Sequence, residues 1–417
     1  MSKNQTIEKR RVVITGVGLV TPLGHNTADS WANIIAGKSG TGPFNVLPRG
    51  DHTMGTICEI KDFDPDVYLG RKEARRRDRV QQIATVAARE AIDQSGLEIT
   101  DENRERIGII LGTGVGGIRT LVEQDRTVVE KGVRRVSPFG ITMIMPNGAA
   151  GMIAIDYGIQ GPSSTITTAC AAGSDAVGHA FRAIQIGEAD AVLTGGSESI
   201  LASVAIGGFE RAGAASKESE NTPRPFDKDR DGLIAGEGAG MLVLESLEFA
   251  LARGATILGE ITGYGRTTDA YHITAPSEGG DGAARAIRLA LADADIQPEN
   301  IDYISAHGTA TQLNDASETA AIKAALGDAA YHVSISSTKS MTGHIMGGTG
   351  AIESVFCTLA IRDQIMPPTI NYHTPDPACD LDYIPNEARP GKVNVCMNNA
   401  FGFGGHNAVL IIEKYKE

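Results

Sequence analysis

Residues 167–180 read TTACAAGSDAVGHA, and they join two kinds of predicted structure at Cys170. The run SSTITT at 163–168 is rich in β-branched residues and predicts a strand. Beyond it, apolar residues recur at helical spacing, so residues 170–187 are expected to form a helix. A strand that turns directly into a helix is the unit of α/β proteins. It would place Cys170 at the positive end of a helix dipole, which should lower the pKa of the thiol below its usual ~8.5.

The same alternation of short apolar runs and helical patterns fills the rest of the chain. In the first half it predicts strands at 11–17, 107–112, 190–194 and 240–245, and helices at 30–37 and 78–96. In the second half it predicts strands at 257–262, 302–306, 333–336, 393–397 and 408–413, and helices at 282–294, 316–326 and 350–363. Buried sheets covered by helices are therefore expected in both halves. No Pro- or Ser-rich linker separates the halves, residues 1–255 and 256–417, so we expect them to pack as one body.

Composition excludes several classes of function. The 417 residues carry a net charge of −13, which disfavours a nucleic-acid partner because such partners select a basic face. No apolar run reaches the ~18–20 residues that cross a bilayer, and the first residues show no secretory signal, so no membrane association is expected. The five cysteines are odd in number and form no CxxC pair. We therefore expect no disulfide framework and no metal site, but reduced thiols in the cytoplasm.

Two segments place histidines directly after predicted strands. SAHGTATQLNDASE at 305–318 carries His307, and SSTKSMTGHIMGGTGAIE at 336–353 carries His344. One histidine is often only structural, but polar residues that follow several strands of an α/β sheet gather where ligands bind. A third segment, NNAFGFGGHNAVLI at 398–411, is a glycine-rich turn whose backbone can approach a ligand closely. There Phe403 could offer both a backbone N–H and a movable ring.

Two other motifs resemble a dinucleotide-binding loop and a calcium-binding loop, but we expect neither function. GTGVGG at 112–117 lacks GxGxxG spacing, and no acidic residue ends a matching second strand. We interpret it as a close-packed turn, which disfavours an NAD-dependent oxidoreductase. PFDKDRDGLIAGEG at 225–238 opens like a calcium loop, but Gly238 stands where the bidentate glutamate belongs. Pro223 and Pro225 also stand where a helix should enter.

Taken together, the motifs resemble those of the β-ketoacyl-acyl carrier protein synthases in order and spacing. The resemblance rests on TTACAAG around Cys170, AHGTATQLND around His307, STKSMTGH around His344, and NNAFGFGGHN. RPFDKDRDGLIAGEGAGMLVLE at 224–245 is also similar to a loop and strand of that family. The resemblance covers residues 11–412 and is strongest to the synthase II branch, which elongates medium and long acyl chains.

The family implies a fold and a reaction. The fold is the α/β thiolase fold, with two pseudo-duplicated halves in a five-layered α-β-α-β-α arrangement, usually as a homodimer. The reaction is the decarboxylative condensation of malonyl-acyl carrier protein with an acyl chain held as a thioester. No cofactor is required, although the resemblance allows a structural monovalent cation near Glu353.

The family also implies a role for each matching residue. Cys170 would be the nucleophile, and His307 and His344 would act in decarboxylation beside Lys339. Backbone N–H groups of Cys170 and Phe403 would form the oxyanion hole, with Phe403 as a gate. Further residues would contact phosphopantetheine (Thr309, Thr311) or support the site (Asp315, Glu318, Glu353).

Two basic stretches interrupt the acidic background, RKEARRRDR at 71–79 and KGVRR at 131–135. Composition alone leaves open whether they are solvated faces or docking sites. The resemblance implies docking of the acidic carrier protein through Lys72, Arg75, Arg76, Arg134 and Arg135.

Two positions depart from the synthase II pattern. Val115 stands where an isoleucine often lines the acyl pocket, and Gly140 stands where a phenylalanine is common near the dimer interface. Because both are smaller, we expect a roomier or differently shaped acyl tunnel.

Two alternatives differ from fatty-acid elongation. A polyketide ketosynthase uses the same three residues, and the sequence leaves that pathway open. A non-catalytic chain-length partner subunit lacks the nucleophilic cysteine, so Cys170 together with both histidines argues against it.

Overall fold

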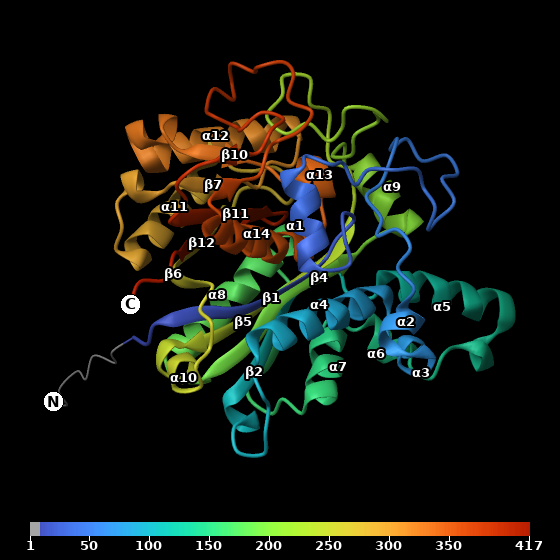
Figure 1. Ribbon diagram of the computed structural model, residues 1–417. Coiled ribbons are helices and arrows are strands. Elements are labelled where there is room, and N and C mark those ends of the chain that lie inside the picture. The colour runs from blue at the N-terminus through green and yellow to red at the C-terminus, as the bar shows by residue number, and fades with distance from the viewer. Residues whose placement is uncertain (1–8) are drawn as a thin grey trace.

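A ten-stranded mixed sheet forms the centre of the molecule, in a computed structural model that describes residues 9–417 (Figure 1). The expected lack of a secretory signal falls partly on residues 1–8, outside the described residues. The strand order is β3-β2-β4-β5-β1-β6-β12-β11-β7-β8. In chain order the strands are β1 (Val12–Val20), β2 (Ile107–Gly112), β3 (Ser163–Ile166), β4 (Ala191–Ser199), β5 (Glu237–Ser246), β6 (Gly259–Thr268), β7 (Tyr303–Ser305), β8 (Ser334–Ser336), β11 (Val395–Gly402) and β12 (His406–Glu413). A small separate sheet pairs β9 (Ile365–Met366) with β10 (Arg389–Pro390).

The sheet is built from two halves with the same topology. In the first half β2 is parallel to β3 and β4, and antiparallel pairs then lead through β5 to β1. In the second half β7 is parallel to β8 and β11, and antiparallel pairs lead through β12 to β6. The expected duplication is therefore confirmed, although the halves share one continuous sheet, joined where residues 12–14 of β1 pair with residues 259–261 of β6. The expected division after residue 255 falls in the loop between α10 (Leu247–Ala252) and β6.

Helices complete the five layers. α8 (Ala172–Gln185) and α14 (Thr349–Asp363) lie between the two halves and contact strands of both. Nearly every residue of these two helices is buried, as a helix enclosed on all sides requires. α4 (Arg79–Ser95) and α7 (Gly148–Tyr157) cover the outer face of the first half, and α11 (Asp281–Ala294) and α12 (Gln312–Leu326) cover that of the second (Figure 1).

Local sequence explains the elements that were predicted well. The side chain of Asp78 accepts the backbone N–H of Val80 and starts α4, and Gly96 ends it with a φ of 62°. At Gly178 in α8, an added Cβ would lie 2.4 Å from the ring of Tyr264, so only glycine lets α8 approach β6 this closely.

Several helices were not predicted, or were predicted only in part. α5 (Ile118–Lys131) extends away from the core with most of its side chains partly or fully exposed, so its apolar residues do not pack into the core of this chain (Figure 1). The remaining helices are mostly short: α1 (Thr27–Ile35), α2 (Pro65–Leu69), α3 (Arg71–Ala74), α6 (Gly140–Ile144), α9 (Ser203–Arg211) and α13 (Lys339–Thr342).

Candidate active site

Cys170 lies in a tight turn between β3 and α8. The turn spans Ala169–Ala171, and α8 begins at Ala172, two residues later than the helix predicted from residue 170. Ala169 adopts a φ of 51°, a conformation that L side chains rarely adopt. The hydroxyl of Thr168 donates to Asp175 at 2.6 Å and anchors the turn to the first part of the helix. The turn thus presents Cys170 in one fixed orientation.

The thiol of Cys170 is buried, and this corrects one prediction. Its sulfur lies 4.0 Å from the sulfur of Met346, inside an apolar cluster. Burial raises the pKa of Cys170 to about 11, while the backbone N–H of Phe403 and the charge of Lys339 act to lower it. The prediction of a lowered pKa is therefore wrong for the free protein, because desolvation outweighs the groups that favour the thiolate.

The second half of the chain places two histidines beside this sulfur. His307 follows β7 and His344 follows β8, and their ring centroids lie 5.4 Å apart at 83°. The backbone N–H groups of His307 and Gly308 donate to the two oxygens of Glu318 at 2.8 and 2.7 Å. The backbone N–H of His344 donates to the carbonyl of Ile234 at 2.7 Å. Both histidines are therefore fixed through their own backbone.

Electrostatics keep both histidines neutral. Burial is the largest cause that lowers the pKa of His307 and of His344 well below the usual range, and the Lys339 ammonium lowers both further. Lys339 donates to Glu353 at 2.7 Å, and both side chains are 1% exposed. Burial raises the pKa of the Glu353 carboxyl to about 7, against the opposing effect of Lys339. A neutral imidazole has one N–H to donate, so the pair offers two hydrogen-bond donors.

Nδ1 of His344 faces the hydroxyl of Thr349. The hydroxyl of Thr349 accepts the backbone N–H of Ile345 at 2.9 Å and lies 3.2 Å from Nδ1 of His344. In the tautomer in which this hydroxyl donates to Nδ1, the ring proton is on Nε2 and is available to a substrate.

Six of the predicted residues line one cavity of about 230 Å³: Cys170, His307, Thr309, Thr311, His344 and Phe403. The hydroxyls of Thr309 and Thr311 lie 3.0 Å apart on its wall. Lys339, Glu318, Glu353 and Asp315 are buried behind the wall. The side chain of Asp315 accepts the backbone N–H of Phe226 at 2.8 Å, and so holds the 224–231 loop against the site. The structure thus brings together all of the predicted catalytic and supporting residues.

The glycine-rich turn after β11 approaches the nucleophile at backbone distance. At Gly402 an added Cβ would lie 2.7 Å from the carbonyl oxygen of Thr168 and 3.1 Å from the backbone nitrogen of Cys170. This contact brings the N–H of Phe403 into hydrogen-bond range of the Cys170 sulfur, where the N–H of Cys170 itself also points. In an oxyanion hole two such N–H groups reach the carbonyl oxygen of the acyl group on the nucleophile, and these two lie beside the sulfur that would carry it.

The motifs at 112–117 and 225–238, which resemble a dinucleotide loop and a calcium loop, have structural roles. Backbone N–H groups of GTGVGG donate to the buried carboxylate of Glu198. In the 225–238 loop, Asp227 accepts the backbone N–H groups of His373 and Thr374 at 2.6 and 2.7 Å. Within residues 9–417, no three His, Cys, Asp or Glu side chains form a group that could hold a metal ion.

Val115 and Gly140 lie outside the 230 Å³ cavity. Val115 is 47% exposed, and Gly140 begins α6 with ordinary van der Waals space around an added Cβ. Their effect on the acyl tunnel stays a prediction.

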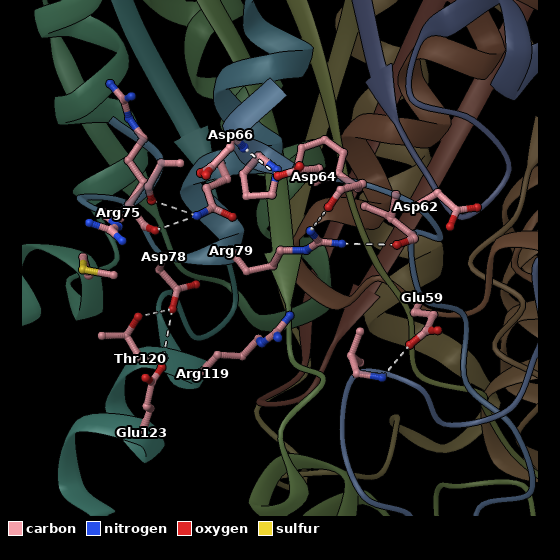
Figure 2. Close-up of a pocket in the computed structure, with 18 of the residues that line it drawn as sticks. Glu59, Asp62, Asp64, Asp66, Arg75, Asp78, Arg79, Arg119, Thr120 and Glu123 are labelled. Atoms are coloured by element: carbon pink, nitrogen blue, oxygen red, sulfur yellow. Dashed lines mark hydrogen bonds between the residues drawn. The ribbon is translucent and has the colours of Figure 1, made fainter. Parts of the chain in front are cut away.

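The basic stretch at 71–79 divides into buried and exposed parts. Arg77 is buried against Asp156 at 2.6 Å, and Arg79 donates to the buried Glu237 at 2.8 Å, so these two have structural roles. Figure 2 shows Arg75, Arg79 and Arg119 around a polar groove between α2, α4 and α5. The predicted docking residues lie outside the catalytic cavity: Lys72, Arg75, Arg134 and Arg135 are exposed, and Arg76 is half-buried with its guanidinium 5.0 Å from the ring centroid of Phe139.

One buried carboxylate of the site was missed by the sequence analysis. Glu198 ends β4 in the run GGSES, which carries no recognisable motif. The only signal was an acidic residue at the carboxyl end of a buried strand, where ligands of open α/β sheets bind.

Comparisons with known proteins agree over nearly the whole chain. Residues 9–250 match the model of the "Beta-ketoacyl synthase, N-terminal domain", and residues 258–373 match that of the C-terminal domain. The chain is 48% identical to a 3-oxoacyl-[acyl-carrier-protein] synthase 2 of Synechocystis sp., over 98% of this chain and 99% of that protein. Among solved structures, the ishigamide ketosynthase/chain length factor matches with a TM-score of 0.90 and 40% identity, over 98% of this chain and 100% of the other. A type II PKS ketosynthase bound to the hexaketide, in complex with its acyl-carrier protein, matches with a TM-score of 0.88 and 36% identity over the same shares.

Proposed function

This chain belongs to the β-ketoacyl synthase family, and on that premise we propose how its residues carry out the condensation of fatty-acid elongation. The enzyme is an acyltransferase that joins an acyl chain to malonyl-acyl carrier protein, releases carbon dioxide and forms 3-oxoacyl-acyl carrier protein. The observation that carries the proposal is the meeting of Cys170, His307 and His344 in one cavity.

Acyl transfer comes first. The sulfur of Cys170 attacks the carbonyl carbon of the incoming acyl thioester, and the carbonyl electrons move onto oxygen. The N–H groups of Cys170 and Phe403 stabilise that oxyanion. The carbon–sulfur bond to phosphopantetheine then breaks, the acyl group stays on Cys170, and the thiol proton leaves with the departing sulfur.

Decarboxylation follows at the histidines. When the malonyl thioester loses carbon dioxide, the electron pair of the broken bond forms an enolate. His307 and His344 donate their N–H groups to its oxygen, which is possible because burial and Lys339 keep both rings neutral. The enolate carbon attacks the acyl carbonyl carbon, the bond to Cys170 breaks as the new carbon–carbon bond forms, and the released thiolate takes up a proton from solvent to restore the thiol. Loss of one such donor typically slows a reaction by ~10²–10³.

Intact-mass analysis tests this order of events. After incubation with acyl-acyl carrier protein, the wild type should gain the mass of one acyl group, and Cys170→Ala should gain none. His344→Asn should still become acylated but should not condense malonyl-acyl carrier protein. An active wild type that never carries an acyl adduct would refute the mechanism.

The polyketide alternative has one specific observation behind it. The ketosynthase that was solved with its carrier protein and a hexaketide shares 36% identity with this chain. The Synechocystis synthase 2 shares 48%, so we propose fatty-acid elongation as the reaction. Repeated condensation without reductases should then give little product beyond one added unit, whereas a polyketide enzyme would extend its own 3-oxoacyl product.

We propose that the exposed basic residues dock the carrier protein. Lys72, Arg75, Arg134 and Arg135 are exposed, and Arg76 contacts Phe139, four residues after the second basic stretch. Complementary charge accelerates and orients such an encounter. The solved ketosynthase complex with an acyl-carrier protein supports this partner.

We propose a homodimer formed through β3. This strand ends the sheet, it pairs only with β2 among residues 9–417, and Ser163 and Ser164 are exposed. Large apolar side chains are exposed on neighbouring segments: Val115, Leu121, Val128, Val129, Val133, Phe139, Ile141, Met145 and Ile155. An unpaired edge beside exposed apolar residues favours pairing with a second copy. Light scattering should give twice the chain mass, and Ser164→Pro should shift it toward one chain.

The residues near Glu353 fit a structural monovalent cation. One oxygen of Glu353 and the amide oxygen of Asn398 are buried without a hydrogen-bond partner among residues 9–417. The amide nitrogen of Asn398 donates to Gly350 and Ser354 on the helix that carries Glu353. Hard oxygen donors suit such an ion. We propose that potassium raises the melting temperature of the wild type, compared with tetramethylammonium, and does so less in Asn398→Ala.

We place the enzyme in the cytoplasm. All five cysteines are free and buried, as expected in a reducing compartment. Within residues 9–417, every helix is too short or too polar to cross a membrane. Fractionation of the native host would test the location.

A further inference from the structure

Glu198 is a buried carboxylate that the mechanism above does not use. It is 0% exposed, and within residues 9–417 it is paired with no cation. Its oxygens accept hydrogen bonds from the hydroxyl of Thr113 at 3.0 Å and from the backbone N–H groups of Gly114, Val115 and Gly347. Burial raises the pKa of Glu198 to about 7, and these four neutral donors favour its ionised form.

The groups that donate hydrogen bonds to Glu198 belong to two loops whose backbones are in direct contact. Residues 113–117 follow β2 in the first half, and residues 346–348 precede α14 in the second. An added Cβ at Gly347 would lie 2.2 Å from the backbone nitrogen of Gly114, and one at Gly114 would lie 2.7 Å from Glu198. The carboxylate therefore joins the two loops at backbone contact, and neither can move while the other stays.

Both loops border the space beside the nucleophile. Met346 places its sulfur 4.0 Å from the Cys170 sulfur. An added Cβ at Gly114 would also lie 3.8 Å from the carbonyl oxygen of Ala169, the residue before Cys170. Val115, the predicted acyl-tunnel residue, is the next residue along and itself donates to Glu198. Glu198 thus joins the two loops that pack against the Cys170 turn.

The second half contains the equivalent arrangement. Glu318 accepts the backbone N–H groups of His307 and Gly308, which follow β7 as Thr113 and Gly114 follow β2. One carboxylate braces the loop of a catalytic histidine. The other, which comes from β4 and not from a helix, braces the loop that contains Val115.

We propose that Glu198 is a positioning residue that holds the 113–117 loop and the 346–348 turn as the wall of the acyl tunnel, and so favours long acyl chains on Cys170. The inference rests on the proposed acyl transfer to Cys170. A short acyl group meets only the part of this wall beside the sulfur, at Met346, whereas a long chain must also run along the rest of it.

The test compares two acyl lengths in one assay at pH 8. Rates of Cys170 acylation are measured by intact mass, with butyryl- and tetradecanoyl-acyl carrier protein as donors. In Glu198→Gln the charge that holds the backbone N–H donors is removed and one of the two accepting oxygens is lost, so the two loops are held less tightly. We expect the tetradecanoyl rate to fall roughly tenfold or more, as for one buried polar group left unpaired, and the butyryl rate to fall less than about threefold.

Two further variants separate a specific effect of Glu198 on long chains from a general loss of folding. Glu90→Gln is the matched control, because Glu90 also accepts only backbone and hydroxyl donors, from Leu19 and Thr27, but lies away from the cavity. It should change neither rate. Thr113→Val removes one donor while keeping the side-chain shape, so it should lower the tetradecanoyl rate selectively even if Glu198→Gln fails to fold.

An equal loss for both donors, or no loss in a folded Glu198→Gln, would overturn the role of Glu198. If the wild type itself formed no acyl adduct, the proposed function would fail instead.

Discussion

The Lys339–Glu353 pair makes stability depend on pH in a way that one substitution can expose. In the wild type the Lys339 ammonium lies 2.7 Å from Glu353, and both side chains are 1% exposed. Burial nevertheless raises the pKa of Glu353 from 4.5 to about 7. A raised carboxyl pKa means that the folded state binds the proton more tightly than the unfolded state does. The associated stability is therefore present below pH 4.5 and is lost as pH rises to 7.

In Lys339→Met the free energy of unfolding should continue to fall as pH rises above 7. Without the ammonium, the pKa of Glu353 in the folded protein rises further above 7. At pH values between 7 and that pKa, the carboxyl is neutral in the folded protein and ionised in the unfolded chain. At pH 6 Glu353 is mostly neutral in both proteins, and we expect their stabilities to agree within about 1 kcal/mol. Above pH 7 the variant should lose about 1.4 kcal/mol per pH unit relative to the wild type. The loss should level off at about 3–5 kcal/mol, the cost of an unpaired buried charge.

Denaturant unfolding at pH 6, 7, 8 and 9 measures this directly. The single tryptophan, Trp31, is buried and donates to Asp363 at the end of α14, so its fluorescence reports unfolding near the pair. In the double variant Lys339→Met/Glu353→Gln the pH-dependent loss should vanish. Lys392→Met, which removes a lysine that is 74% exposed and 3.7 Å from Asp302, is the surface control and should show no such slope. A destabilisation by Lys339→Met that is the same at every pH would refute the reasoning.

Three other substitutions test separate parts of the site. Gly140→Phe should fold, because an added Cβ has its nearest neighbours at 3.7 Å, and it should shorten the acyl products; an unchanged range by mass spectrometry would remove Gly140 from the tunnel. Arg134→Glu/Arg135→Glu should raise KM for acyl carrier protein roughly tenfold with kcat nearly unchanged and should weaken the salt dependence of kcat/KM; a loss confined to kcat would argue against docking. Gly402→Ala places a methyl group 2.7 Å from the carbonyl oxygen of Thr168, so acylation should fall by roughly 10² or more as the Phe403 N–H withdraws; normal acylation would exclude that N–H from the oxyanion hole.

The sequence pattern predicted two kinds of element correctly: helices with their own capping residues, and strands or helices whose apolar side chains pack into the core. α4 has a side-chain cap at Asp78 and a left-handed glycine at Gly96, and both ends were found within one residue. β2 is buried along its whole length and was found at its exact bounds. α5 was missed because its exposed valines, Val128 and Val129, do not mark a core-facing side. Such a helix is held by contacts that no short window of sequence contains.

The sequence predicted which catalytic residues form the site, but it did not predict the pKa of Cys170. Cys170, His307 and His344 were found because each follows a strand and carries a recognisable motif. The pKa of Cys170 was mispredicted, since its environment includes Met346, which is 176 residues away in sequence. Glu198 was missed for the same reason: its donors come from both halves of the chain. Desolvation depends on what packs against a group, and sequence spacing does not report that.

The duplication explains why catalysis needs both halves of the chain. Cys170 lies in the turn between β3 and α8, and His344 lies in the corresponding connection between β8 and α14, after the short helix α13. Because α8 and α14 pack against each other in the central layer, the two turns open into the same cavity. One turn holds the acyl group and the other stabilises the enolate, so the two have no reason to keep similar side chains. A half-molecule would retain its strands and helices but would offer only a thiol or only a pair of imidazoles. Separately expressed halves should therefore form condensation product only when mixed under conditions that allow the continuous β1–β6 pairing to form.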